Sequence, residues 1–149
     1  MPSKRVVMSA SRRRSLVVTD SSVIISSLVH QDPGIVQECR AQIERSNAVI
    51  GHVLAESYAR ITTMPGGFRL PPASAWQLLT EMFPTEPLSL SGAGYRRIVD
   101  LVSQLGVPGG AIYDCLIAET ARESGAMLVS LDKRAASNYR SVGVDFTLL

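Results

Sequence analysis

Short apolar runs alternate with longer amphipathic stretches along the chain. The short runs are rich in branched apolar residues, a pattern that predicts strands. These predicted strands cover residues 16–19, 48–50, 88–90, 126–130 and 144–148. The stretches between them have helical periodicity, and the predicted helices cover residues 21–29, 35–45, 51–64, 71–82, 95–105, 112–124 and 133–139. This alternation is typical of an α/β domain with a mainly parallel sheet.

Length and charge divide the chain into a basic arm and one domain. With 149 residues, 46% of them hydrophobic, the chain can bury one core, so residues 16–149 are predicted to form a single domain. Residues 1–15 hold five of the fifteen basic residues and none of the thirteen acidic ones. The domain itself therefore carries a formal charge of about −3, and the overall charge of +2 does not indicate a nucleic-acid-binding face.

Two further features bear on the cellular setting. Cys39 and Cys115 have no metal-ligand spacing, which favours a reducing, cytoplasmic environment over a disulfide framework. No apolar run reaches the roughly 18 residues that a membrane span needs, so no membrane association is predicted. The apolar run after the arginines of the arm stops at Asp20, which argues against an export signal.

Four acidic residues stand beside predicted core segments. Asp20 and Asp132 each end a predicted strand, whereas Glu56 and Asp114 lie in apolar helical segments. The remaining acids are expected in polar, solvent-exposed settings. Carboxylates beside a core are costly unless a cation or hydrogen bonds compensate them. Because functional groups collect beyond the carboxyl ends of parallel strands, the four are expected to converge there, and carboxylate oxygens suit Mg²⁺ or Mn²⁺.

Each acid also has an ordinary structural interpretation. Asp20 and Asp132 would both serve as helix caps, and Glu56 would form a surface ion pair with Arg60 one turn later. Asp114 is the hardest to explain in this way, because no basic residue lies three or four positions from it.

The order and spacing of these segments resemble a known family. The segments are Val18–Ile24, Leu54–Glu56, Tyr113–Ala118 and Leu128–Asp132. Together they resemble the PIN-domain ribonucleases, specifically the VapC-type toxins of bacterial toxin–antitoxin pairs, over residues 16–149. The resemblance implies a PIN-like three-layer α/β/α fold with a five-stranded, mainly parallel sheet. It also implies Mg²⁺- or Mn²⁺-dependent endonucleolytic cleavage of RNA by metal-activated water, inhibition of translation and growth, homodimerisation and a VapB-like antitoxin.

The resemblance also assigns roles to individual residues. It implies that Asp20, Glu56, Asp114 and Asp132 are catalytic metal ligands and that Ser22 and Ser130 orient them. Many relatives carry a further aspartate and an aromatic residue after the fourth acid, where this chain has Arg134-Ala135-Ala136, so a second metal position is left open. Replacing Asp20 or Asp114 with asparagine is expected to leave folding intact and to remove cleavage.

Other residues and other functions remain as alternatives. Contacts with RNA phosphates are predicted for four arginines of the domain's helices, Arg60, Arg96, Arg97 and Arg122, although a solvated helix face explains any one of them equally well. His52 is given a capping or structural role, with a general base as its alternative. One rival function is a catalytically silent domain that binds RNA or a partner. Another is an aspartate-based phosphotransfer domain, although phosphatases of the haloacid-dehalogenase type need a second aspartate where Ser22 stands.

Overall fold

The computed structural model describes residues 15–149, so the predicted basic arm lies outside the described residues except for its last position. Three strands occur in the described part: β1 (Leu16–Thr19), β2 (Ala126–Ser130) and β3 (Phe146–Leu148). Its α-helices are α1 (Ser21–Leu28), α2 (Pro33–Arg45), α3 (Gly51–Thr63), α4 (Pro72–Met82), α5 (Gly92–Gln104), α6 (Ala111–Glu123) and α7 (Ala136–Val142). A short 3-10 helix, η1 (Gly66–Phe68), lies between α3 and α4. The predicted α/β class is confirmed.

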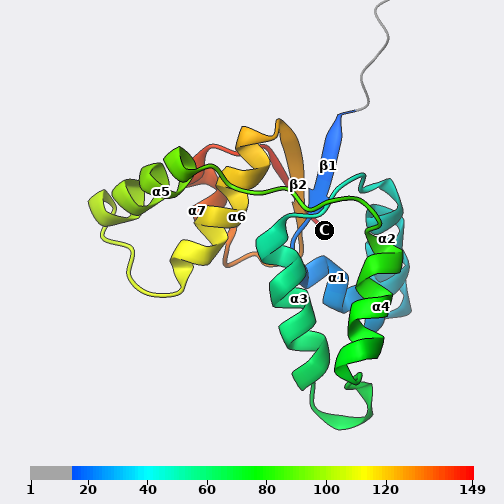
Figure 1. The fold of residues 1–149 in the computed structure, drawn as a ribbon. Helices are drawn as coiled ribbons and strands as arrows, with labels where there is room; N and C mark the ends of the chain where they lie inside the picture. Colours follow the sequence, from blue (N-terminus) through cyan, green and yellow to red (C-terminus); the bar gives the residue numbers. More distant parts are fainter. Residues whose placement is uncertain (1–14) are drawn as a thin grey trace, which may run out of the picture.

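The strands form one parallel sheet in the order β1-β2-β3 (Figure 1). Thr19 pairs with Val129, so β1 and β2 end at the same edge of the sheet. The backbone N–H of Asp20 still bonds to the carbonyl of Val129 at 3.0 Å. This register brings the residues that follow the two strands together, although more than a hundred positions separate them in the sequence.

The sheet differs from the five strands predicted. Residues 48–50 and 88–90 meet only through an isolated parallel bridge between Ile50 and Leu88. The N–H and C=O groups of Val17 in β1 bond instead to two side chains from the loop after α2, at 3.1 and 2.9 Å. Because those side chains satisfy polar groups of the edge strand, the sheet has three strands in the described residues.

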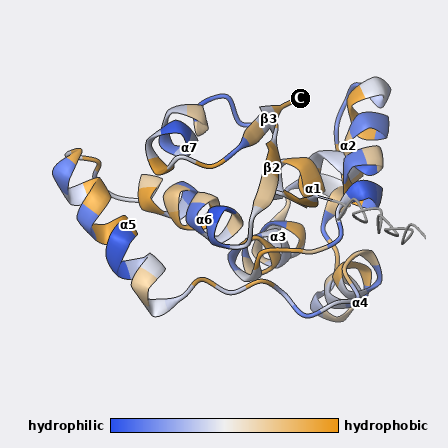
Figure 2. Ribbon diagram, turned by 90° about the horizontal axis from the view of Figure 1, so that it is seen from above, coloured by the Kyte–Doolittle hydropathy of each residue, from blue (hydrophilic) through white to orange (hydrophobic). Residues whose placement is uncertain are grey.

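Helices cover both faces of the sheet (Figure 2). On one side α1 and α2 pack against each other and against the strands, and on the other α6 packs against β2, α5 and α7. α3 and α4 pack together as a pair that extends away from the sheet (Figure 1). Val18, Ile24 and Leu128 are fully buried between these layers. α6 leads directly into β2 through Gly125, whose φ of 66° favours glycine.

Cys39 and Cys115 are both buried and free. Across residues 15–149, every helix is too short or too polar to cross a membrane.

Candidate active site

Asp20 lies between β1 and α1 and is the N-cap residue of that helix. Its Oδ1 atom accepts hydrogen bonds from the backbone N–H groups of Ser22 at 3.0 Å and Val23 at 3.3 Å. The residue is only 5% exposed. The helix cap considered from the sequence is therefore present, and its backbone bonds use one of the two carboxylate oxygens.

Three hydroxyl groups complete the surroundings of the Asp20 carboxylate. The hydroxyl of Ser22 donates to Oδ1, and that of Ser130, at the end of β2, donates to Oδ2. Tyr139 of α7 also donates to Oδ2, at 3.0 Å. With the two backbone groups, five donors hold one buried carboxylate and fix its orientation.

Ser22 and Ser130 connect Asp20 to the loop after β2. Ser22 Oγ accepts a hydrogen bond from the N–H of Leu131 at 3.0 Å, and Ser130 Oγ accepts one from the N–H of Asp132 at 2.9 Å. Each hydroxyl thus accepts a hydrogen bond from a backbone N–H group and donates one to the Asp20 carboxylate. These are the contacts expected of residues that orient a carboxylate.

Tyr139 was missed by sequence reasoning. Burial, followed by the nearby charge of Asp20, raises the pKa of its phenol well above the ordinary value, so the hydroxyl remains a donor at neutral pH. The hydrogen bond joins residues 119 positions apart, and the sequence offers no local signal that would pair them. The contact arises only when α7 packs against α6 and Tyr139 meets Phe146 of β3 edge to face.

Asp114 lies in the first turn of α6 and is half-buried. Burial raises the pKa of its carboxyl, and a hydrogen bond from Asn138 Nδ2 at 3.5 Å partly opposes that rise. The negative charges of Asp132, Glu56 and Asp20 raise the pKa further. The other three acids predicted from the sequence therefore lie near enough for their charges to act on Asp114.

Glu56 and Asp132 each had a structural alternative, a surface ion pair for Glu56 and a helix cap for Asp132. Glu56 is half-buried on α3, and within the described residues it forms no ion pair with Arg60. Asp132 accepts a hydrogen bond from the N–H of Arg134 at 2.9 Å, and its carboxylate lies 3.5 Å from Nε of that exposed arginine. The helix cap proposed for Asp132 is thus absent, because α7 begins only at Ala136 with Ala135 as its N-cap, and Asp132 instead bonds to the turn before that helix. The ion pair proposed for Glu56 is also absent from residues 15–149.

The carboxylates share a region without forming a closed cluster. Among residues 15–149, no three Asp, Glu, His or Cys side chains are close enough to hold a metal ion as they stand. The groups nevertheless offer only carboxylate oxygens, the ligands that hard divalent cations prefer. In its chemistry this donor set fits Mg²⁺ or Mn²⁺.

Glu119 contradicts the expectation that the remaining acids are solvent-exposed. It is 1% exposed on α6 and bonds to Arg97 and Arg122, each at 2.8 Å. The hydrogen bond from Arg122 is the main reason why the pKa of Glu119 is lowered. Arg97 also donates to the carbonyl of Val142 at 3.1 Å. Two of the four arginines predicted to contact RNA therefore already bind an internal carboxylate. The three-residue spacing of Glu119 and Arg122 could have suggested their ion pair, whereas the pair with Arg97 has no such local signal.

A hollow of about 1070 Å³ lies at the opposite ends of the strands, next to Ser15, Val17 and Ala126. Its charged residues are Glu44, Arg45, Arg122 and Asp145. None of the four predicted acids lines it. The candidate active site therefore lies at the carboxyl ends of the strands, away from this hollow.

Residues 17–140 match the family model of the PIN domain. The chain belongs to the PIN-domain family. Ribonuclease VapC27 of Mycobacterium tuberculosis is 37% identical over 128 residues, which cover 86% of this chain and 93% of that protein. Ribonuclease VapC40 of the same organism is 29% identical over 134 residues, covering 90% of this chain and 99% of the relative. The chain is thus a PIN domain of VapC type.

Solved structures agree with this PIN fold. The crystal structure of VapBC2 from Rickettsia felis, bound to a DNA fragment from its promoter, matches with a TM-score of 0.63 and 14% identity, covering 90% of this chain and 98% of that one. FitAcB from Neisseria gonorrhoeae matches with a TM-score of 0.67 and 18% identity, covering 88% and 96%. At these identities the likeness concerns the fold alone.

Proposed function

We propose that this VapC-type PIN domain is an endoribonuclease dependent on Mg²⁺ or Mn²⁺ and the toxin of a VapBC-type toxin–antitoxin pair that inhibits translation and growth. The observation that carries the proposal is the placement of Asp20 and Asp132 after the adjacent ends of β1 and β2, with Asp114 of α6 near enough to feel their charges. Burial and these charges raise the pKa of Asp114, as is typical of a carboxylate in a catalytic or metal site. The names of the related VapC ribonucleases support the same activity.

In this proposal the four acids hold the ion and the hydroxyl network orients them. Asp20, whose carboxylate has five donors, is the fixed ligand, and Asp114, Glu56 and Asp132 approach it from α6, α3 and the loop after β2. When bound, the ion would polarise the phosphodiester and lower the pKa of the attacking water. Ser22 and Ser130 keep Asp20 in position during that step.

RNA phosphates need cations near this acidic region. Arg60 on α3 and Arg96 on α5 are exposed and are the better candidates. Arg97 and Arg122 are already bonded to Glu119, so a phosphate would have to compete with a buried carboxylate for them. We therefore assign phosphate contacts to Arg60 and Arg96.

The family match argues against a phosphotransfer domain. Residues 17–140 match the PIN domain. Ser22 also stands where phosphatases of the haloacid-dehalogenase type need a second aspartate. A catalytically silent binding domain is the remaining rival, and measurements of metal binding and cleavage separate it from the nuclease.

The first prediction concerns Asp114→Asn. The neutral side chain should weaken ion binding, so Mn²⁺-dependent cleavage of total cellular RNA should fall by about 100-fold or more, beyond the usual effect of changing a residue that only supports a ligand. Asp100→Asn changes an exposed acid on α5 and should cleave like the wild type. Cleavage products are mapped by sequencing new RNA ends. Undiminished cleavage by Asp114→Asn would refute the proposed site.

We also propose a VapB-like antitoxin and a homodimer as partners. The VapBC2 and FitAcB structures support a partner of this kind, because their folds match over most of this chain. Co-expression with the neighbouring gene should restore growth and yield a stable complex. Light scattering on the isolated chain should give twice the mass of 16.1 kDa. A toxic chain that no neighbouring gene product neutralises would exclude the antitoxin proposal.

A further inference from the structure

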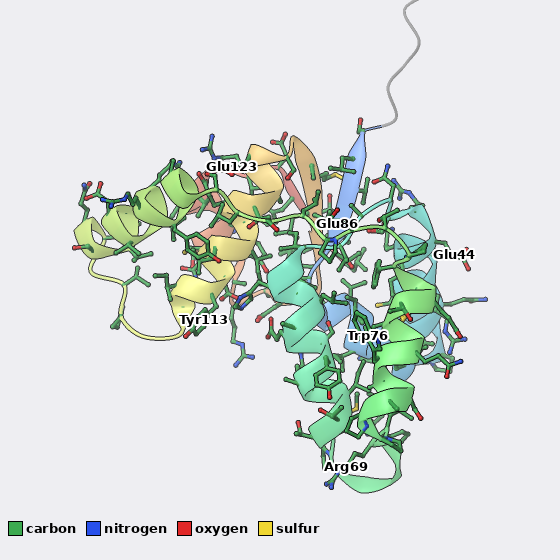
Figure 3. The ribbon with its side chains drawn as sticks, viewed as in Figure 1. Glu44, Arg69, Trp76, Glu86, Tyr113 and Glu123 are labelled. Atoms are coloured by element: carbon green, nitrogen blue, oxygen red, sulfur yellow. The ribbon has the colours of Figure 1, made fainter. Side chains whose placement is uncertain are left out.

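Two aromatic rings lie beside the proposed ion site and take no part in the carboxylate network. His52 of α3 and Tyr113 of α6 are stacked, with ring centroids 5.3 Å apart and planes inclined by 18°. Figure 3 labels Tyr113 at the beginning of α6. Tyr113 is 53% exposed and His52 is partly exposed. The stack therefore presents an aromatic surface to solvent.

The position of each ring follows from the helices that carry the acids. Tyr113 immediately precedes Asp114, and His52 lies one helical turn before Glu56. Residues four apart on a helix have Cβ atoms about 5–6 Å apart, so His52 borders Glu56 directly. The same two helices thus provide two proposed ligands and an aromatic surface next to them.

Core packing does not account for the exposure of Tyr113. The buried face of α6 is formed by the residues after it, including Cys115, Ile117 and Ala118. Tyr113 contributes half of its surface to solvent rather than to that core. Because an aromatic ring gains most from being covered, a half-exposed ring beside a candidate active site indicates a ligand with a flat, apolar face.

A nucleobase has such a face. Without its ion, the proposed site holds four carboxylates that repel the phosphates of RNA, so contacts that carry no charge contribute to binding there. Base stacking on aromatic side chains supplies such contacts and tolerates different bases. We propose that the His52–Tyr113 stack is a platform for an unpaired nucleobase of RNA adjacent to the phosphodiester that is cut. This inference rests on the ribonuclease function proposed above.

The test measures RNA binding without cleavage. The probes are fluorescein-labelled single-stranded RNAs of about twelve nucleotides, oligo(U), oligo(A) and an abasic version, titrated in EDTA and followed by anisotropy. Tyr113→Ala should weaken binding by about 5- to 150-fold, the range expected for one stacked base. Tyr113→Phe keeps the ring and should restore wild-type affinity. The abasic RNA should bind the wild type and Tyr113→Ala equally.

Two comparisons separate stacking from charge and from general damage. Phe68→Ala removes an exposed aromatic ring, 63%, from η1, away from His52 and Tyr113, and should bind RNA like the wild type. The dependence of affinity on salt should be the same for Tyr113→Ala and the wild type, whereas loss of a phosphate-binding arginine would reduce it.

Failure of the platform and failure of the proposed nuclease are distinguishable. If the wild type binds RNA with these ring effects and does not cleave it in Mn²⁺, the nuclease fails and the platform stands. Equal affinity of Tyr113→Ala and the wild type, no binding by the wild type, or no restoration by Tyr113→Phe would overturn the platform. So would a Tyr113→Ala variant that loses only its antitoxin, because the ring would then contact a protein.

Discussion

At the residue scale, Asp20 combines a structural and a proposed catalytic role. Its Oδ1 atom accepts the backbone hydrogen bonds of a helix cap, and its Oδ2 atom accepts hydrogen bonds from the hydroxyls of Ser130 and Tyr139. The sequence alone presents Asp20→Asn and Asp114→Asn as equally harmless to folding. The structure separates them, because Asp114 accepts a single hydrogen bond, at 3.5 Å, from Asn138.

Asp20→Asn should therefore destabilise the fold more than Asp114→Asn does. The asparagine amide replaces one acceptor oxygen with a donor, so at least one of the groups that bond to Asp20 loses its acceptor. We expect a loss of about 1–3 kcal/mol in the free energy of unfolding for Asp20→Asn, and less than about 1 kcal/mol for Asp114→Asn. Urea unfolding of both variants measures the difference. Equal stabilities would show that the network around Asp20 contributes little to folding.

At the element scale, Glu119 joins α5 to α6. Arg97 of α5 and Arg122 of α6 both bond to its buried carboxylate. The pKa of Glu119 is lowered, mainly by the hydrogen bond from Arg122. A lowered pKa means that the ionised carboxylate stabilises the fold at neutral pH. This contribution is present above the ordinary pKa of about 4.5 and is lost as the pH falls through the lower value of the folded protein.

Glu119→Gln should consequently be less stable than the wild type by about 1–3 kcal/mol at pH 7, with a smaller difference below about pH 4.5. The two unfolding curves, measured across this pH range, test the sign. Glu86→Gln changes an exposed acid and should show no such convergence. A difference that grows on acidification would mean that Glu119 does not stabilise the fold as a carboxylate.

The three strands of the sheet were predicted as well as the helices, since β1 and β2 have the predicted bounds, and only the two strands predicted at 48–50 and 88–90 failed to join the sheet. The strong periodicity after Gly110 predicted a helix over residues 112–124, close to the observed α6. The apolar residues 48–50 also resemble a strand, yet their pairing depends on what occupies the edge of β1. Side chains from the loop after α2 bond to Val17 there. Partners so distant in the sequence leave no local pattern.

At the scale of the whole molecule, ion binding should be linked to folding. A ligand that binds only the folded state at 100 times its Kd adds about 2.7 kcal/mol of stability. Saturating Mn²⁺ should therefore raise the melting temperature of the wild type, and EDTA should reverse the change. Asp114→Asn should show little of this shift, whereas Asp100→Asn should retain it. An equal shift in all three proteins would indicate that Mn²⁺ binds elsewhere.

The sequence by itself determined the α/β class, the resemblance to VapC-type PIN domains and the four acids worth examining. Apolar periodicity and the position of a carboxylate at the end of a strand are local properties, and they can be read from neighbouring residues. The tertiary structure decided the rest. It connected Tyr139 to Asp20, enclosed Glu119 between two arginines and stacked His52 on Tyr113. These contacts join separate elements, so their geometry exists only after the helices have packed around the sheet.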